Sequence, residues 1–138
     1  MARGYNNFNP GNIRISGTRY LGEVYPSKDP CFKQFESMQY GYRAMFVLLH
    51  TYCTKYGLKT LQAMIERYAP PVENDTRSYV GFVSMRTKIA DISTVDSLNG
   101  AQMISIVAAM SRMENGVEPD MGDIRSAWEM FFDEYSKK

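Results

Sequence analysis

The pattern that decides the fold lies in residues 37–57, which read SMQYGYRAMFVLLHTYCTKYG. Apolar side chains recur in this stretch at intervals of three and four residues, at Tyr42, Met45, Phe46, Leu49, Cys53 and Tyr56. This spacing places them on one face of an α-helix, and glycine commonly ends helices. The stretch therefore predicts a long amphipathic helix that begins near Ser37 and ends at Gly57.

Four more helices are predicted downstream by the same spacing. Thr60 can cap one that ends before Pro70, and Asn74 or Asp75 can cap the next. A further helix covers roughly residues 100–114, and the last lies near the C-terminus. The apolar stripes of these helices consist of Leu61, Met64, Ile65, Tyr68, Tyr79, Phe82, Val83, Met103, Ile106, Val107, Met110, Met113, Ile124, Trp128, Phe131, Phe132 and Tyr135.

The N-terminal quarter of the chain follows a different pattern. Asparagine, proline and glycine are dense between residues 6 and 12, a combination typical of turns. Ile13 and Ile15 then alternate with polar Arg14 and Ser16, so we expect a small β-hairpin or three-stranded sheet here. A small sheet and about five helices predict one α+β, mainly helical domain that spans residues 1–138.

Composition narrows the classes of function. The 16 basic and 15 acidic residues leave a net charge of +1 and form no basic stripe, so nucleic acid is not an expected partner. A single histidine, His50, argues against a His-rich metal site or a His-based triad, and we expect it to be structural. Cys31 and Cys53 could form one disulfide, although two buried free thiols fit the pattern better.

No segment approaches the roughly 20 apolar residues that a membrane-spanning helix needs. The first five residues also lack the apolar run of a signal peptide. We therefore expect a protein that is made in the cytoplasm and that reaches any target outside the cell by another route.

Glu114 stands out among the carboxylates. It shares a helix face with Met103 and Met110, and it directly precedes Asn115-Gly116, a helix-ending signal. Apolar surroundings and the negative end of a helix dipole both raise the pKa of a carboxyl group. A general acid for the cleavage of a polysaccharide needs such a raised pKa. Glu114 is therefore the predicted acid, the alternative being a helix-end glutamate that turns to solvent.

Two other carboxylates are further candidates. Glu73 precedes a predicted helix start, where the positive end of the dipole favours the charged form, so it is the predicted charge-stabilising partner. Plain helix capping is its alternative role. Glu36 lies where the sheet meets the first long helix and is the alternative acid. Its structural alternative is a carboxylate in the first turn of the helix, beside the capping residue Ser37.

The turn-rich N-terminal loop supplies candidate sugar ligands. Asn7, Asn9, Asn12 and Arg14 could bind hydroxyl and N-acetyl groups, although asparagines in turns often satisfy their own backbone. Tyr79 is the candidate for a stacking or hydrogen-bonding wall of the same site.

Four short segments occur in a set order: RGYNNFNPGNIR at residues 3–14, GYRAM at 41–45, YAPPVENDT at 68–76 and MENG at 113–116. Together they resemble the lysozyme-like muramidases of phages and prophages, which include endolysins and virion-associated structural proteins. Met113 stands where that family usually has histidine, and Phe8 stands where it has asparagine.

The resemblance implies a lysozyme-like fold, peptidoglycan as the substrate, and no cofactor or metal. The order of the segments suggests a circularly permuted arrangement that brings Glu114 beside the loop of residues 6–14. We therefore predict a muramidase or lytic transglycosylase, with the second route expected if the cleft holds a single carboxylate. A non-catalytic virion or cell-wall-binding protein is the alternative. In either case we expect a monomer that acts on the wall after release or is carried in a virion with other virion proteins.

Overall fold

Six helices and one two-stranded sheet make up the described part of the chain, residues 2–72 and 74–138 of a computed structural model. The elements are α1 (Arg3–Asn6), β1 (Glu23–Val24), β2 (Gln34–Phe35), α2 (Met38–Lys55), α3 (Leu61–Tyr68), α4 (Thr76–Thr87), α5 (Gly100–Asn115) and α6 (Met121–Tyr135). This is the mainly helical α+β class that the sequence predicts. The prediction missed α1 because four residues are too few to show a helical period.

The helix ends follow the predicted capping residues. The side chains of Ser37, Thr60 and Asp75 each accept a hydrogen bond from the backbone N–H three residues further on. Of the two candidates for the start of α4, Asp75 is thus the cap. Gly57 and Gly116 follow α2 and α5 with φ of 66° and 76°, a left-handed conformation that glycine adopts without steric cost.

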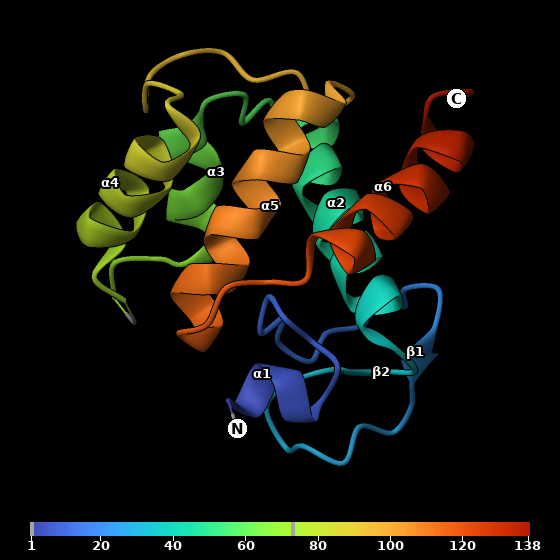
Figure 1. Cartoon of the computed structure of the whole chain (residues 1–138). Coiled ribbons are helices and arrows are strands. Elements are labelled where there is room, and N and C mark those ends of the chain that lie inside the picture. The colour runs from blue at the N-terminus through green and yellow to red at the C-terminus, as the bar shows by residue number, and fades with distance from the viewer. Residues whose placement is uncertain (1, 73) are drawn as a thin grey trace.

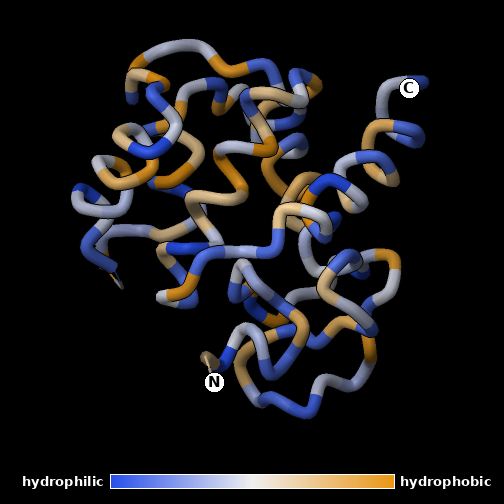
Figure 2. The backbone as a smooth tube through the Cα atoms, viewed as in Figure 1, coloured by the Kyte–Doolittle hydropathy of each residue, from blue (hydrophilic) through white to orange (hydrophobic). Residues whose placement is uncertain are grey.

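The core lies between α2, α5 and α6. In Figure 1, α5 crosses α2, with α3 and α4 to one side and α6 to the other. Phe46 and Leu49 from α2, Ile106 from α5 and Phe131 from α6 are fully buried. Each such side chain stabilises the fold by about 1.5–3 kcal/mol relative to exposure. Figure 2 shows hydrophobic positions recurring between hydrophilic ones along the helices, as in amphipathic helices.

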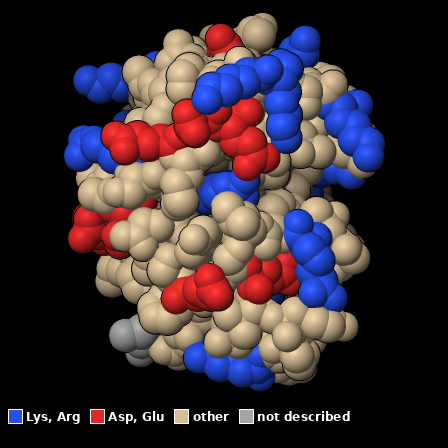
Figure 3. All heavy atoms as spheres, turned by 90° about the vertical axis from the view of Figure 1, so that its right-hand side faces the viewer, with Lys and Arg blue, Asp and Glu red and all other residues tan. Residues whose placement is uncertain are grey.

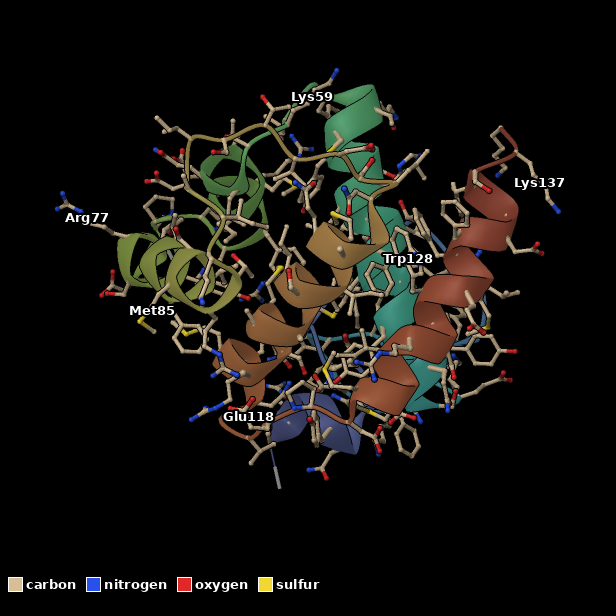
Figure 4. All side chains as sticks on the ribbon, turned by 45° about the horizontal axis from the view of Figure 1, so that its top comes forward. Lys59, Arg77, Met85, Glu118, Trp128 and Lys137 are labelled. Carbon is tan, nitrogen blue, oxygen red and sulfur yellow. The ribbon has the colours of Figure 1, made fainter. Side chains whose placement is uncertain are left out.

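Aromatic rings attach α6 to α2. Trp128, labelled in Figure 4, lies edge-on to Phe46 with ring centroids 5.1 Å apart. His50 packs against Phe131 at 5.4 Å, and its Nδ1 atom lies 2.8 Å from the Ser97 hydroxyl. These contacts agree with the structural role expected for His50.

The N-terminal segment forms the predicted hairpin beneath the helices (Figure 1). β1 and β2 pair antiparallel, with Glu23 opposite Phe35, and an isolated bridge joins Arg14 to Phe32. The ammonium group of Lys33 lies 3.0 Å from the Glu23 carboxylate, and both side chains are almost wholly buried. A buried charge needs such a partner because water is excluded from it. The pair therefore helps to hold β2 and the residue before it against β1.

Three further properties bear on function. Both cysteines are free thiols, but Cys31 is exposed, so the expectation that both are buried is wrong for it. Its position on the loop before β2 leaves it at the surface. The structure of residues 2–72 and 74–138 holds no helix with the length and hydrophobicity that crossing a bilayer requires. Figure 3 shows Lys and Arg interspersed with Asp and Glu on the face that it presents.

Candidate active site

Glu114 lies in the last turn of α5, where the helix meets the N-terminal loop. Its side chain is half-buried and accepts two hydrogen bonds. The Asn12 amide donates to Oε1 at 2.9 Å, and the Tyr79 hydroxyl donates to Oε2 at 2.8 Å. The predicted proximity of Glu114 to the loop of residues 6–14 is thus confirmed, and the carboxyl group is held at both oxygens.

The loop is held against α5 by contacts on either side of Asn12. The Asn115 amide donates to the backbone carbonyls of Pro10 at 2.7 Å and Ser111 at 2.9 Å. The Tyr68 hydroxyl donates to the carbonyl of Gly11. Asn12 itself has a φ of 50°, which asparagine tolerates better than most residues. These contacts aim the Asn12 amide at the carboxyl group of Glu114.

The surroundings of Glu114 favour its protonated form. Burial raises the pKa of the carboxyl group, while the hydrogen bonds from Asn12 and Tyr79 lower it, and the net effect is a raised pKa. Burial and the nearby Glu114 charge also raise the pKa of Tyr79 and of Tyr68 well above the usual range. Both tyrosines therefore remain protonated at neutral pH and can act as hydrogen-bond donors.

Glu114 opens onto a groove of about 550 Å³. The groove lies between the segment of residues 11–20, the second half of α2 and the end of α3. Its described walls carry three cationic side chains, from Arg14, Lys55 and Arg67. Glu114 is the only carboxylate among the lining residues that the structure describes. The Glu114 carboxyl group therefore lies in a setting whose described charged neighbours are mainly cationic.

The structure separates the predicted sugar ligands into two groups. Asn12 and Arg14 line the groove. Asn7 and Asn9 are buried, so the prediction that they bind sugar is wrong. The Asn7 amide donates to the Asp29 carboxylate at 3.1 Å, and the Asn9 amide donates to the carbonyls of Ile13 and Lys33. Their hydrogen-bonding capacity is used to hold the loop together.

The structure describes the positions of two of the three other candidate site residues. Tyr79 is 4% exposed and lies behind Glu114, so it is a hydrogen-bonding partner of the acid and not a wall for stacking. Glu36, the predicted alternative acid, is exposed and does not line the groove beside Glu114. Glu73, the predicted charge-stabilising partner, lies outside the described residues.

Several residues of the groove were not predicted from the sequence. Tyr68 and Tyr56 were assigned to the apolar stripes of helices, yet both line the groove, as do Lys55 and Arg67. The missed signal was the position of these residues in the last turns of two consecutive helices. Within residues 2–72 and 74–138, no group of three or more His, Cys, Asp or Glu side chains is placed to hold a metal ion.

No family model matches the chain. One curated protein does: Protein P5 of Pseudoalteromonas phage PM2 is 39% identical over 121 residues, which cover 86% of this chain and 74% of the relative. An identity of this level over this length indicates common descent and a shared fold. The chain belongs to the family of phage PM2 Protein P5. The P5 relationship places the chain among phage-related proteins, in agreement with the phage context that the sequence motifs suggested.

Proposed function

We propose that this P5-family protein cleaves the glycan strands of bacterial peptidoglycan, with Glu114 as the general acid. The observation that carries the proposal is the setting of Glu114: a half-buried carboxyl group of raised pKa, held by Asn12 and Tyr79 at the edge of a groove. Cleavage of a glycosidic bond needs a carboxylic acid that keeps its proton near neutral pH.

In the proposed reaction, Glu114 protonates the glycosidic oxygen as the bond from that oxygen to the anomeric carbon breaks. The leaving sugar departs as an alcohol, and positive charge develops at the anomeric carbon. The Asn12 amide and the Tyr79 hydroxyl then stabilise the carboxylate that Glu114 has become, because both donate to it. The same two groups hold the carboxyl group in one orientation throughout.

The lining of the groove favours a route that uses one carboxylate. Two-carboxylate hydrolysis needs a second Asp or Glu about 5–9.5 Å from the acid. Glu114 is the only carboxylate among the lining residues that the structure describes, and the route that we propose therefore quenches the cation within the substrate itself, as in a lytic transglycosylase or a substrate-assisted enzyme. In the transglycosylase route, a hydroxyl oxygen of the same sugar forms the new bond to the anomeric carbon, and Glu114, now ionised, accepts the proton of that hydroxyl and returns to its acid form.

The relationship to P5 favours a second candidate, a non-catalytic virion or wall-binding component of a phage particle. The observation behind it is that the relative, at 39% identity, is a protein of a phage. Met113, which stands where the muramidases that the chain resembles usually have histidine, agrees with either candidate. The enzyme would act on peptidoglycan, and the non-catalytic protein would bind the cell wall or other proteins of the phage particle. The two candidates differ in whether a glycosidic bond is cut.

The two candidates are separated by incubating the purified chain with isolated sacculi and analysing the released muropeptides. For an enzyme, Glu114→Gln lowers the release by at least about 100-fold, the usual contribution of a general acid. Glu36→Gln is the matched control, since it removes an exposed carboxylate outside the groove. Anhydro products indicate the transglycosylase route, and reducing ends indicate hydrolysis.

Three outcomes of this assay carry different meanings. No release by the unmodified chain, together with binding to sacculi, supports the non-catalytic candidate. Equal release by the unmodified chain and Glu114→Gln removes Glu114 from the reaction. A loss of release in Glu73→Gln that matches the loss in Glu114→Gln overturns the one-carboxylate route.

A further inference from the structure

A cationic cluster lies at the edge of the groove where α2 and α3 end. It consists of Lys55, Tyr56 and Arg67, all of which are exposed. The Arg67 guanidinium lies 4.1 Å from the centre of the Tyr56 ring, and the Lys55 ammonium lies 5.4 Å from the same centre. Arg67 also lies 5.4 Å from the ring of Tyr52. The tyrosine faces thus hold two positive charges close together.

These two positive charges have no carboxylate partner among the described residues. Several other cations of the molecule are paired, such as Arg43 with Glu134 at 2.9 Å and Arg86 with Glu118. Within residues 2–72 and 74–138, Lys55 and Arg67 form no ion pair, although both face a groove. Arg14, the third cation of the groove, has interaction partners of its own and is not needed for the argument.

The charge balance of the groove points to an anionic ligand. Its described lining holds cations and a single carboxyl group, and burial raises the pKa of that group toward the neutral form. Bringing Lys55 and Arg67 together costs repulsion that a bound anion would relieve. Arginine in particular binds carboxylates through paired N–H donors. The cluster therefore suits one or two carboxylates presented at the rim of the groove.

We propose that Lys55 and Arg67 bind the free carboxylates of the peptide stems on peptidoglycan, so that the groove selects glycan that carries acidic peptides. This rests on the proposed function only in taking peptidoglycan as the ligand. The sugar rings themselves are uncharged, and an aromatic side chain of the groove lining such as Tyr20 suits them. A nucleic acid fits less well, because the chain carries a net charge of only +1 and has no basic stripe that could follow a line of regular phosphates.

The test uses the Glu114→Gln variant, which by the proposed function leaves its ligand uncut, and soluble muropeptides in two forms. One form keeps its stem carboxylates, and in the other they have been converted to amides. Calorimetry gives the affinity for each. We expect the acidic form to bind about two- to fivefold more tightly for each cation engaged. Adding Lys55→Gln and Arg67→Gln removes that preference but leaves binding of the amidated form unchanged.

Lys59→Gln is the matched control, because Lys59 (labelled in Figure 4) is an exposed cation nearby that lines a different cavity. This variant keeps the preference. Equal affinity for both muropeptide forms, or no binding of either, overturns the proposal. Tighter binding of a single-stranded oligonucleotide that competes with the muropeptides overturns it in favour of nucleic acid. Cleavage of sacculi without a charge preference overturns this inference alone, whereas a charge preference without cleavage overturns only the proposed enzymatic function.

Discussion

The protonation of Glu114 depends on a balance between burial and two hydrogen bonds. Burial raises the pKa of its carboxyl group, and the donors on Asn12 and Tyr79 oppose that rise because they stabilise the charged form. As pH increases through the pKa of Glu114, the acid form is lost and proton donation stops. The pKa therefore sets the upper pH limit of the proposed activity, and each donor moves that limit downward.

Tyr79→Phe is expected to raise the pKa of Glu114 further, since it removes one stabilising donor and keeps the aromatic ring. Carbon-13 NMR of the Glu114 carboxyl group measures this directly, without any need for activity. In an active enzyme, the descending limb of the pH profile of kcat/KM moves to higher pH. Tyr135→Phe, on α6, is the control and leaves the titration unchanged. An unchanged or lowered pKa in Tyr79→Phe would contradict the hydrogen bond seen here.

At the scale of elements, the site depends on how α1 and the loop after it meet the end of α5. Gly4 of α1 lies at this junction and is buried. A Cβ atom on Gly4 would lie 2.6 Å from the backbone oxygen of Asn9, and within 2.8 Å of the side-chain oxygens of Asn115 and Asn12. Both side-chain oxygens are buried without a hydrogen-bond partner in the described structure. The absence of a side chain at Gly4 is therefore what lets the two asparagines reach their positions.

Gly4→Ala is expected to destabilise the fold by about 1–3 kcal/mol, the usual cost of overpacking. Because the loop must shift, the Asn12 amide also moves away from Glu114, and activity falls by more than the folded fraction explains. Gly17→Ala is the matched control, since a Cβ atom there meets nothing within 4 Å. Urea unfolding and specific activity are measured on both variants. Equal stability of the two variants would show that the junction can relax.

At the scale of the whole molecule, the burial of the Glu114 carboxylate lowers the free energy of unfolding at neutral and higher pH. Burying Glu114 raises its pKa in the folded chain above that in the unfolded chain, so the folded chain binds the proton more tightly. Stability is then greatest below the unfolded pKa and declines as pH rises through the folded pKa. A molecule selected only for stability would have an apolar or amide side chain at this position.

Glu114→Gln is therefore expected to unfold at a higher temperature than the unmodified chain at pH 8, by about 2–6 °C, and at a similar temperature near pH 4. Glutamine can accept from Asn12 through its oxygen and donate to the Tyr79 hydroxyl, so both contacts survive. Thermal unfolding across this pH range measures the difference. Glu36→Gln should show no such pH-dependent gap. A variant less stable than the unmodified chain at pH 8 would mean that the charged form is the favoured one.

Much of the architecture could be predicted because it is specified locally. The apolar spacing in residues 37–57, the capping side chains of Ser37 and Thr60, and the left-handed glycine after α5 act over one or two helical turns. The place of Glu114 followed from the same rules, since its helix face and the Asn115-Gly116 ending are local features. The sequence by itself therefore determined the five longer helices, the hairpin and the best candidate for the acid.

Only the tertiary structure decided which polar residues belong to the site. Asn7, Asn9 and Asn12 share one turn-rich loop and look alike in sequence, yet the first two are buried in contacts that hold the loop, and the third reaches Glu114, 102 positions away. The cationic cluster likewise forms where two helix ends meet. Hydrogen bonds and interactions between charges depend on distance in space, and the spacing of residues in the sequence does not report that distance beyond a few helical turns. The contacts of each polar side chain therefore follow from how the loop packs against α5.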